Sequence, residues 1–180
     1  MNILLTIGIV IVGIIVLLLI IALFVKKDCT IIREISINKP KQEVFNYIKY
    51  VKNQDNYSKW NMQDPQMKKE YVGNDGAVGF IYKWDSNDKH VGKGEQTINA
   101  ITEGQKIDMG LLFIKPFAGI ADASMTTENV SGNQTRVKWS FTSHMKYPMN
   151  LMSLFMNMEK MMGNDLQAGL SRLKDLLEKR

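Results

Sequence analysis

Alternating apolar and polar positions in the middle of the chain predict a series of β-strands. The clearest is TRVKWSFTSHMK (135–146), where Val137, Trp139 and Phe141 alternate with polar side chains. Such alternation places one face of a strand in a core and the other in water. Further strands are predicted at 29–38, 67–72, 77–85, 90–102, 105–114 and 119–128. Turn sequences such as GNDG (73–76) separate them, so consecutive strands are expected to pair as an antiparallel meander.

Helical spacing of apolar residues appears before and after these strands. The segment KPKQEVFNYIKYVKN (39–53) carries Val44, Phe45 and Ile48 at helical spacing, and QDNYSKW (54–60) predicts a short helix or a turn. From Met149 to Arg180 the pattern predicts one long amphipathic helix. Its apolar stripe consists of Leu151, Phe155, Met158, Met162, Leu166, Gly169, Leu173 and Leu177.

The order of these elements predicts an α+β fold. A sheet that is wet on one face needs its other face covered, and the C-terminal helix is the only predicted element long enough to cover it. The expected architecture is therefore a curved antiparallel sheet wrapped around that helix. Gly163 and Gly169 each cost the helix about 1 kcal/mol relative to alanine, and we interpret them as points of close approach to the sheet. The neighbouring Met156, Met158, Met161 and Met162 would fill the irregular space that remains.

Residues 3–25 contain no charged side chain and predict a single transmembrane helix. At about 1.5 Å per residue the segment exceeds a bilayer core of about 30 Å. A cleaved signal peptide is the alternative, but the segment lacks a basic start and an A-x-A-like cleavage site. Lys26 and Lys27 follow directly, which predicts a cytoplasmic C-terminal portion. The expected division is a membrane anchor at 1–27 and one domain at 28–180.

Charge and cysteine content exclude several classes of function. The 180 residues carry a formal net charge of +5, and part of that excess lies beside the anchor, which is too little to predict nucleic-acid binding. A single cysteine, Cys29, allows no intrachain disulfide and no thiolate metal cluster. The two histidines have no metal-ligand spacing, and no nucleophilic triad motif is present. No metal, cofactor or catalytic residue is therefore predicted.

Several sequence segments resemble those of the SRPBCC superfamily, which includes START, polyketide-cyclase and birch-pollen-allergen proteins. They are YSKW (57–60), DPQMKKEYVGNDGAVGFIYKW (64–84), VGKGEQTI (91–98), KPF (115–117), NQTRVKWSF (133–141) and LFMNMEKMMGNDLQAGLSRLK (154–174). The resemblance covers about residues 29–180 and is nearest to the bacterial polyketide cyclase/dehydrase branch. It implies a helix-grip fold with a deep apolar cavity between sheet and helix. Some members of this superfamily catalyse cyclisation or hydrolysis, and many simply bind a small molecule.

The strand phase places aromatic side chains and methionines on the face that the helix covers, which is a typical lining for an apolar ligand. The predicted lining residues are Tyr82, Trp84, Met109, Phe113, Met125, Trp139, Phe141, Phe155, Met158 and Met162. The same phase places His144 and Asp122 outside, and His90 falls in a turn.

Three hypotheses follow from the lining and the missing catalytic motifs. The first is a membrane-anchored binding module for a hydrophobic small molecule that is lipid-like, aromatic or polyketide-like. The second is a cyclase-like or hydrolase-like enzyme that uses a cavity tyrosine or carboxylate, such as Tyr82 or Glu95, as acid or base. The third is a structural domain that presents its outer sheet to a protein partner.

Overall fold

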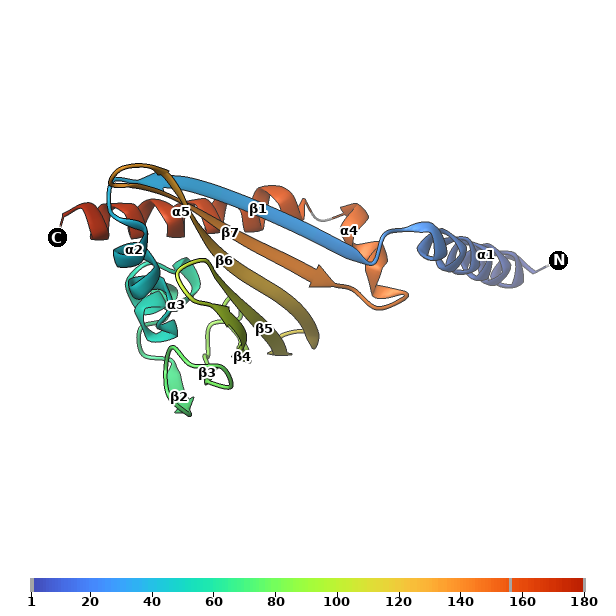
Figure 1. Ribbon diagram of the computed structural model, residues 1–180. Helices are drawn as coiled ribbons and strands as arrows, with labels where there is room; N and C mark the ends of the chain where they lie inside the picture. Colours follow the sequence, from blue (N-terminus) through green and yellow to red (C-terminus); the bar gives the residue numbers. More distant parts are fainter. Residues whose placement is uncertain (1, 156, 180) are drawn as a thin grey trace.

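One seven-stranded antiparallel sheet forms the body of the protein. The computed structural model describes residues 2–155 and 157–179. The strands follow the spatial order β1-β7-β6-β5-β4-β3-β2, so β2 to β7 form a meander and β1 joins it beside β7 (Figure 1). They are β1 (Asp28–Ile37), β2 (Lys68–Val72), β3 (Ile81–Asp85), β4 (Lys93–Thr102), β5 (Lys106–Lys115), β6 (Gly119–Ser131) and β7 (Gln134–His144). The predicted meander is confirmed.

Two strands begin later than the sequence pattern predicts. The segment 77–85 enters the sheet only at Ile81, because Gly76 and Gly79 have φ angles of +79° and +87°, which belong to turns rather than strands. The segment 90–102 enters it at Lys93, after Gly92 with a φ angle of +67°. Both differences shorten a strand without moving its buried face.

Helices close the concave side of the sheet. The short helices α2 (Lys41–Ile48), η1 (Val51–Asn56) and α3 (Lys59–Gln63) follow β1, and the long α5 (Met158–Glu178) runs beside β1 (Figure 1). An ion pair between Lys59 and Asp165 joins α3 to α5. One cluster of buried apolar side chains from the sheet and these helices forms the core. The α+β helix-grip architecture expected from the sequence is confirmed.

The predicted single helix from 149 to 180 is wrong in its first third. The structure has η2 (Met149–Leu151) and α4 (Met152–Phe155), and α5 begins afresh at Met158. Asn157 causes the restart, since its side-chain oxygen accepts a hydrogen bond of 2.9 Å from the Lys160 N–H and caps α5. Met156 and Arg180, which belonged to the predicted helix, lie outside the described residues.

Both glycines of α5 lie at close contacts. A Cβ atom on Gly169 would lie 2.9 Å from Cζ3 of Trp139 on β7, so the glycine lets α5 approach the inner face of the sheet as predicted. A Cβ atom on Gly163 would lie 2.0 Å from Nη2 of Arg33, whose guanidinium forms an ion pair of 2.7 Å with Glu159. Gly163 is therefore buried under a side chain of β1.

An apolar helix, α1 (Ile3–Phe24), precedes the sheet and projects away from it (Figure 1). Its 22 residues are long and apolar enough to cross a membrane, a property that a signal sequence shares. Only Ala22 of this helix is buried.

Candidate functional site

A continuous row of aromatic rings lies along the inner face of the sheet. Tyr82 and Trp84 of β3 are stacked with centroids 5.8 Å apart, and Trp84 meets Phe113 of β5 edge-on at 6.1 Å. Phe113 contacts Phe141 of β7 at 6.5 Å. The row crosses β4 at Gly94, which pairs with Trp84 and Phe113, and a Cβ there would lie 2.5 Å from Cζ2 of Trp84. The missing side chain of Gly94 thus makes room for the indole ring.

The structure brings together most of the predicted lining residues. Six are 9% exposed or less, namely Tyr82, Trp84, Met109, Met125, Trp139 and Phe141. Phe113, Met158 and Met162 are half-buried and pack against the core from its edge. The seven strand residues among these nine lie on the inner face of the sheet, as the strand pattern predicts, and Met158 and Met162 of α5 pack against the same core.

Phe155 is the exception. It lies in α4, before the restart at Asn157, and its side chain is 80% exposed. The prediction assumed one continuous helix, in which Phe155 would follow the same stripe as Met158 and Met162. The break at Asn157 removes that alignment, so Phe155 does not lie on the buried face of α5.

Two aromatic residues of the segment 54–60 complete this face, and the sequence pattern did not identify them. Tyr57 is fully buried and meets Trp139 edge-on at 5.8 Å, and Trp60 meets the same indole at 6.4 Å. Tyr57 directly follows η1, and Trp60 lies in the short helix α3. A segment this short has no hydrophobic period from which burial could be predicted.

Two buried amides lie among these rings. The Nε2 atoms of Gln54 and Gln96 lie 3.8 Å and 2.8 Å from the sulfur of Met109. Gln54 is 4% exposed and Gln96 is 7% exposed. A thioether sulfur is a weak acceptor, so both side chains retain hydrogen-bonding capacity for a stronger partner.

Two buried phenols have similar surroundings. The hydroxyl of Tyr57 lies 3.6 Å from the sulfur of Met125, and that of Tyr82 lies 4.0 Å from the sulfur of Met67. Burial raises the pKa of both phenols well above the ordinary value, and neighbouring tyrosines and, for Tyr82, Asp55 add to the rise. Both hydroxyl groups therefore stay protonated and act as donors at neutral pH.

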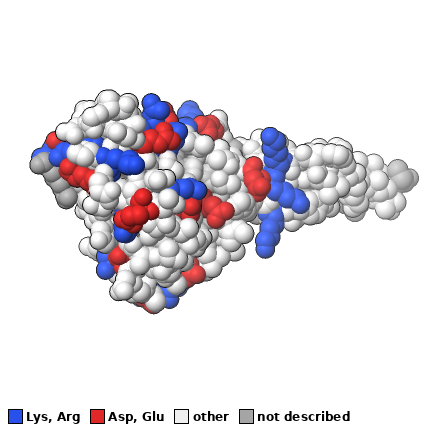
Figure 2. All heavy atoms as spheres, viewed as in Figure 1, with Lys and Arg blue, Asp and Glu red and all other residues white. Residues whose placement is uncertain are grey.

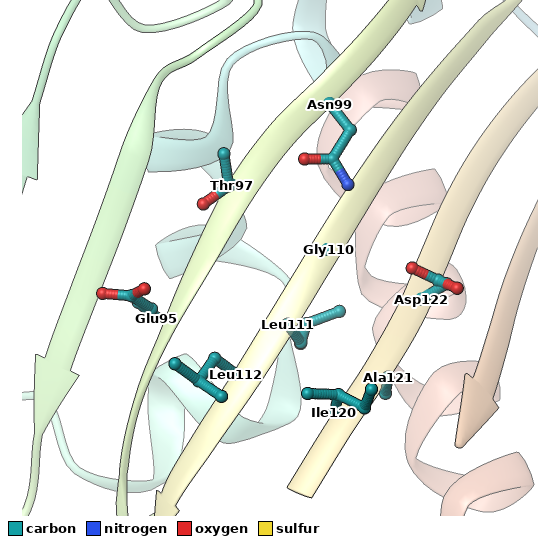
Figure 3. A pocket seen from close by; sticks show the side chains of 9 residues that line it. All are labelled: Glu95, Thr97, Asn99, Gly110, Leu111, Leu112, Ile120, Ala121 and Asp122. Carbon is teal, nitrogen blue, oxygen red and sulfur yellow. The ribbon is translucent and has the colours of Figure 1, made fainter. Parts of the chain in front are cut away.

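Glu95 lies on the opposite face of the sheet. It lines an open hollow of about 300 Å³ over β4, β5 and β6, where Gly110 forms the floor between Thr97 and Asp122 (Figure 3). Glu95 therefore does not face the aromatic row, and the hypothesis that it acts there as acid or base is wrong. Asp122 lies on the outer face, as the strand phase predicts.

His144 bridges two carboxylates at the end of β7. Its Nδ1 atom lies 2.9 Å from Asp28 and its Nε2 atom lies 2.8 Å from Asp122, which raises the pKa of the imidazole above its ordinary value. His144 is on the outer face as predicted, but it is partly buried and joins β1, β6 and β7. His90 is exposed in a turn. Among residues 2–155 and 157–179, no group of three metal-binding side chains occurs.

The sequence matches no protein-family model and no curated protein. Solved structures are similar in fold. Norcoclaurine synthase from Thalictrum flavum is 12% identical, with a TM-score of 0.62 over 85% of this chain and 95% of that one. Ara h 8.0201 is 17% identical, with a TM-score of 0.57 over 85% and 99%, and protein MLL2253 from Mesorhizobium loti is 14% identical, with a TM-score of 0.59 over 84% and 98%.

At sequence identities of 12–17%, the similarity to these structures shows a shared fold and nothing further. The neighbours have the curved sheet and long helix of the Bet v 1-like and START-like proteins. The chain therefore has an α+β helix-grip fold, preceded by an apolar helix.

Proposed function

We propose that the protein is a membrane-anchored binding module for a hydrophobic small molecule, held between the inner face of the sheet and α5. The observation that carries this proposal is the aromatic row with its half-buried edge. Phe113, Met158 and Met162 are partly exposed and pack against the buried apolar cluster. Methionines adapt to ligands of different shape, and aromatic rings supply large contact area.

The buried polar groups narrow the chemistry of the ligand. Four side chains can donate hydrogen bonds within this apolar surrounding, namely Gln54, Gln96, Tyr57 and Tyr82. Each of them donates to the thioether sulfur of a methionine in the structure. Apolar sites usually orient a ligand through a few such groups. A ligand with an apolar body and one carbonyl, hydroxyl or carboxyl oxygen would satisfy them better than sulfur does.

An enzyme of the polyketide cyclase/dehydrase branch is the second candidate. One solved neighbour, norcoclaurine synthase, is described in complex with dopamine and hydroxybenzaldehyde, so this fold can hold small aromatic reactants. Tyr82 is the remaining acid candidate on the inner face of this chain. Its neutral phenol donates a hydrogen bond to the sulfur of Met67, and a thioether sulfur would not act as a base. The binding module is therefore the better-supported function.

The proposed placement is a single-pass membrane protein with the domain in the cytoplasm. The uncharged α1 and the lysines that follow it support this orientation. Protease added to intact cells is expected to leave the domain undigested, and digestion there would contradict the orientation.

Native mass spectrometry of the full chain, purified in detergent from its own host, tests the binding proposal. We expect a fraction of the chain to carry one extra small-molecule mass. Met158→Trp would fill the edge of the site and lower that fraction, whereas Met161→Trp, which changes an exposed neighbour, would leave it unchanged. Equal retention in both variants would contradict a site beside α5, because lipids bound to α1 alone would produce that result.

A further inference from the structure

The end of α1 is joined to the domain by one buried side chain. Asn150 of η2 donates hydrogen bonds to the carbonyl oxygens of Ala22 and Val25, at 2.7 Å and 2.9 Å. Asn150 and Ala22 have no exposed surface. The last carbonyls of a helix lack partners within the helix, so Asn150 caps α1 from another part of the chain. This joint fixes the segment that carries Asn150 against the helix.

Two further contacts extend the joint, one along α1 and one beyond its end. The hydroxyl of Tyr147 donates to the carbonyl of Leu19 at 3.4 Å, and the Met145 N–H donates to the carbonyl of Lys27 at 2.7 Å. Leu19 precedes Val25 by six positions, which corresponds to roughly 9 Å along a helix. The segment 147–155, hereafter the ledge, therefore starts beside the apolar length of α1 rather than beyond its end.

The ledge presents apolar side chains outward. Phe155 is 80% exposed and Leu154 is 57% exposed, and Met149 and Tyr147 are each more than two-fifths exposed. Large apolar side chains that are exposed within one short segment indicate an interaction site. Its position next to an apolar helix suggests which partner would cover it.

Basic side chains surround the same place. Lys26 and Lys27 follow α1, and Lys146 precedes Tyr147, and all three are exposed. Figure 2 shows basic residues gathered at the narrow neck between the domain and α1. Ammonium groups at this level match the phosphates of anionic lipids, and tyrosine favours the boundary between headgroups and acyl chains.

We propose that the ledge is a membrane-embedded surface, held against α1 by Asn150 so that Phe155 and Leu154 lie among the upper acyl chains of an anionic phospholipid bilayer. This inference rests on the proposed membrane anchoring by α1. It makes α1 and the domain one body at the bilayer surface instead of a domain on a free tether. The N-terminal end of α5, which carries Met158 and Met162, then lies directly beside the lipid.

Depth-dependent fluorescence quenching of the full chain tests the ledge. Cys29→Ser removes the only cysteine, and single cysteines at Phe155, Val16 and Val78 then carry an environment-sensitive NBD label. Val78 is 62% exposed in the loop before β3, so it is an apolar control away from α1. The chains are placed in vesicles of phosphatidylcholine and phosphatidylglycerol that contain a lipid with a nitroxide on its acyl chain.

We expect the labels at Phe155 and Val16 to be quenched and the label at Val78 to stay bright. Quenching at Val16 with none at Phe155 would overturn the ledge and leave the anchor intact. An unquenched Val16 would overturn the anchor itself. Asn150→Ala is expected to reduce quenching at Phe155 but not at Val16, whereas Asn164→Ala on the exposed face of α5 changes neither. Unchanged quenching in Asn150→Ala would show that this side chain does not hold the ledge.

Discussion

Gly169 determines how closely α5 approaches the sheet. Trp139 lies where a side chain at this position would project, and the carbonyl of Tyr57 lies 3.4 Å from the same point. The glycine weakens the helix by about 1 kcal/mol relative to alanine, but it allows an indole ring to pack directly on the helix backbone. A local cost in helix stability is thus offset by a contact in the core.

Gly169→Leu is expected to lower the free energy of unfolding by about 1–3 kcal/mol, because the added side chain overpacks the contact with Trp139. The improved helix propensity would recover only about 1 kcal/mol. Chemical denaturation measures the change. Ser171→Leu on the exposed face of the same helix serves as the control and should be nearly neutral. A Gly169→Leu protein as stable as this control would show that α5 does not touch the sheet there.

His144 connects three strands through its two carboxylate partners. Because Asp28 and Asp122 raise its pKa above the ordinary value of 6.5, the imidazolium is favoured in the folded state. The resulting stabilisation is complete below the unfolded-state pKa and is lost as the pH rises through the higher folded-state pKa.

We therefore expect the unfolding free energy of the protein to fall over that pH interval, and His144→Gln to remove this part of the pH dependence. Asp122→Asn should reduce it, because one hydrogen bond that favours the imidazolium is weakened. Nuclear magnetic resonance titration of the His144 ring protons gives the folded-state pKa directly. A value at or below 6.5 would contradict the two-carboxylate geometry.

At the scale of elements, Asn157 separates α4 from α5. Its side chain supplies the acceptor that the first turn of α5 lacks, as asparagine commonly does at a helix start. After the break, α4 contacts η2, and η2 in turn contacts α1. One capping residue therefore decides which side chains belong to the inner face and which belong to the ledge.

Asn157→Ala is expected to destabilise the protein by about 0.5–2 kcal/mol through loss of the cap. Thermal unfolding followed by circular dichroism measures this effect. Asn164→Ala is the matched control, since this asparagine is exposed within α5 and alanine is the better helix former. Equal melting temperatures for the two variants would show that the cap at Asn157 contributes nothing.

The sequence predicts the sheet well and the helix boundaries less well, for physical reasons. Strand alternation has a period of two, so Trp84, Trp139 and Phe141 could be assigned to the inner face without knowledge of the turns. Asn157 occupies a polar position within the predicted helix 149–180, so the hydrophobic pattern does not mark it as a cap. Gln96 shares the strand phase of the buried Ile98, but an amide gives no apolar signal, so the pattern does not show that its side chain packs against Met109.

At the scale of the whole molecule, the main core is independent of α1. Every buried apolar residue of the core cluster lies between Ile31 and Leu177, whereas Ala22 and Leu19 of α1 contact the segment 147–150 through hydrogen bonds from Asn150 and Tyr147. Residues 28–180 are therefore expected to fold alone as a soluble domain with a cooperative thermal transition. Circular dichroism of this fragment should show mixed helix and strand, and an unfolded spectrum would mean that α1 is needed for folding.

The central claim is that an apolar molecule is held between the aromatic row and α5. The most direct measurement is a titration of folded 28–180 with the fluorescent fatty acid cis-parinaric acid, using the parent fragment, Met162→Trp and Met161→Trp. Met162 is half-buried at the edge of the site, and Met161 is exposed beside it. We expect the parent and Met161→Trp to bind the probe equally, and Met162→Trp to bind it more weakly with an unchanged or higher melting temperature. Absence of binding in the parent, or binding that is equal in all three, would contradict the claim.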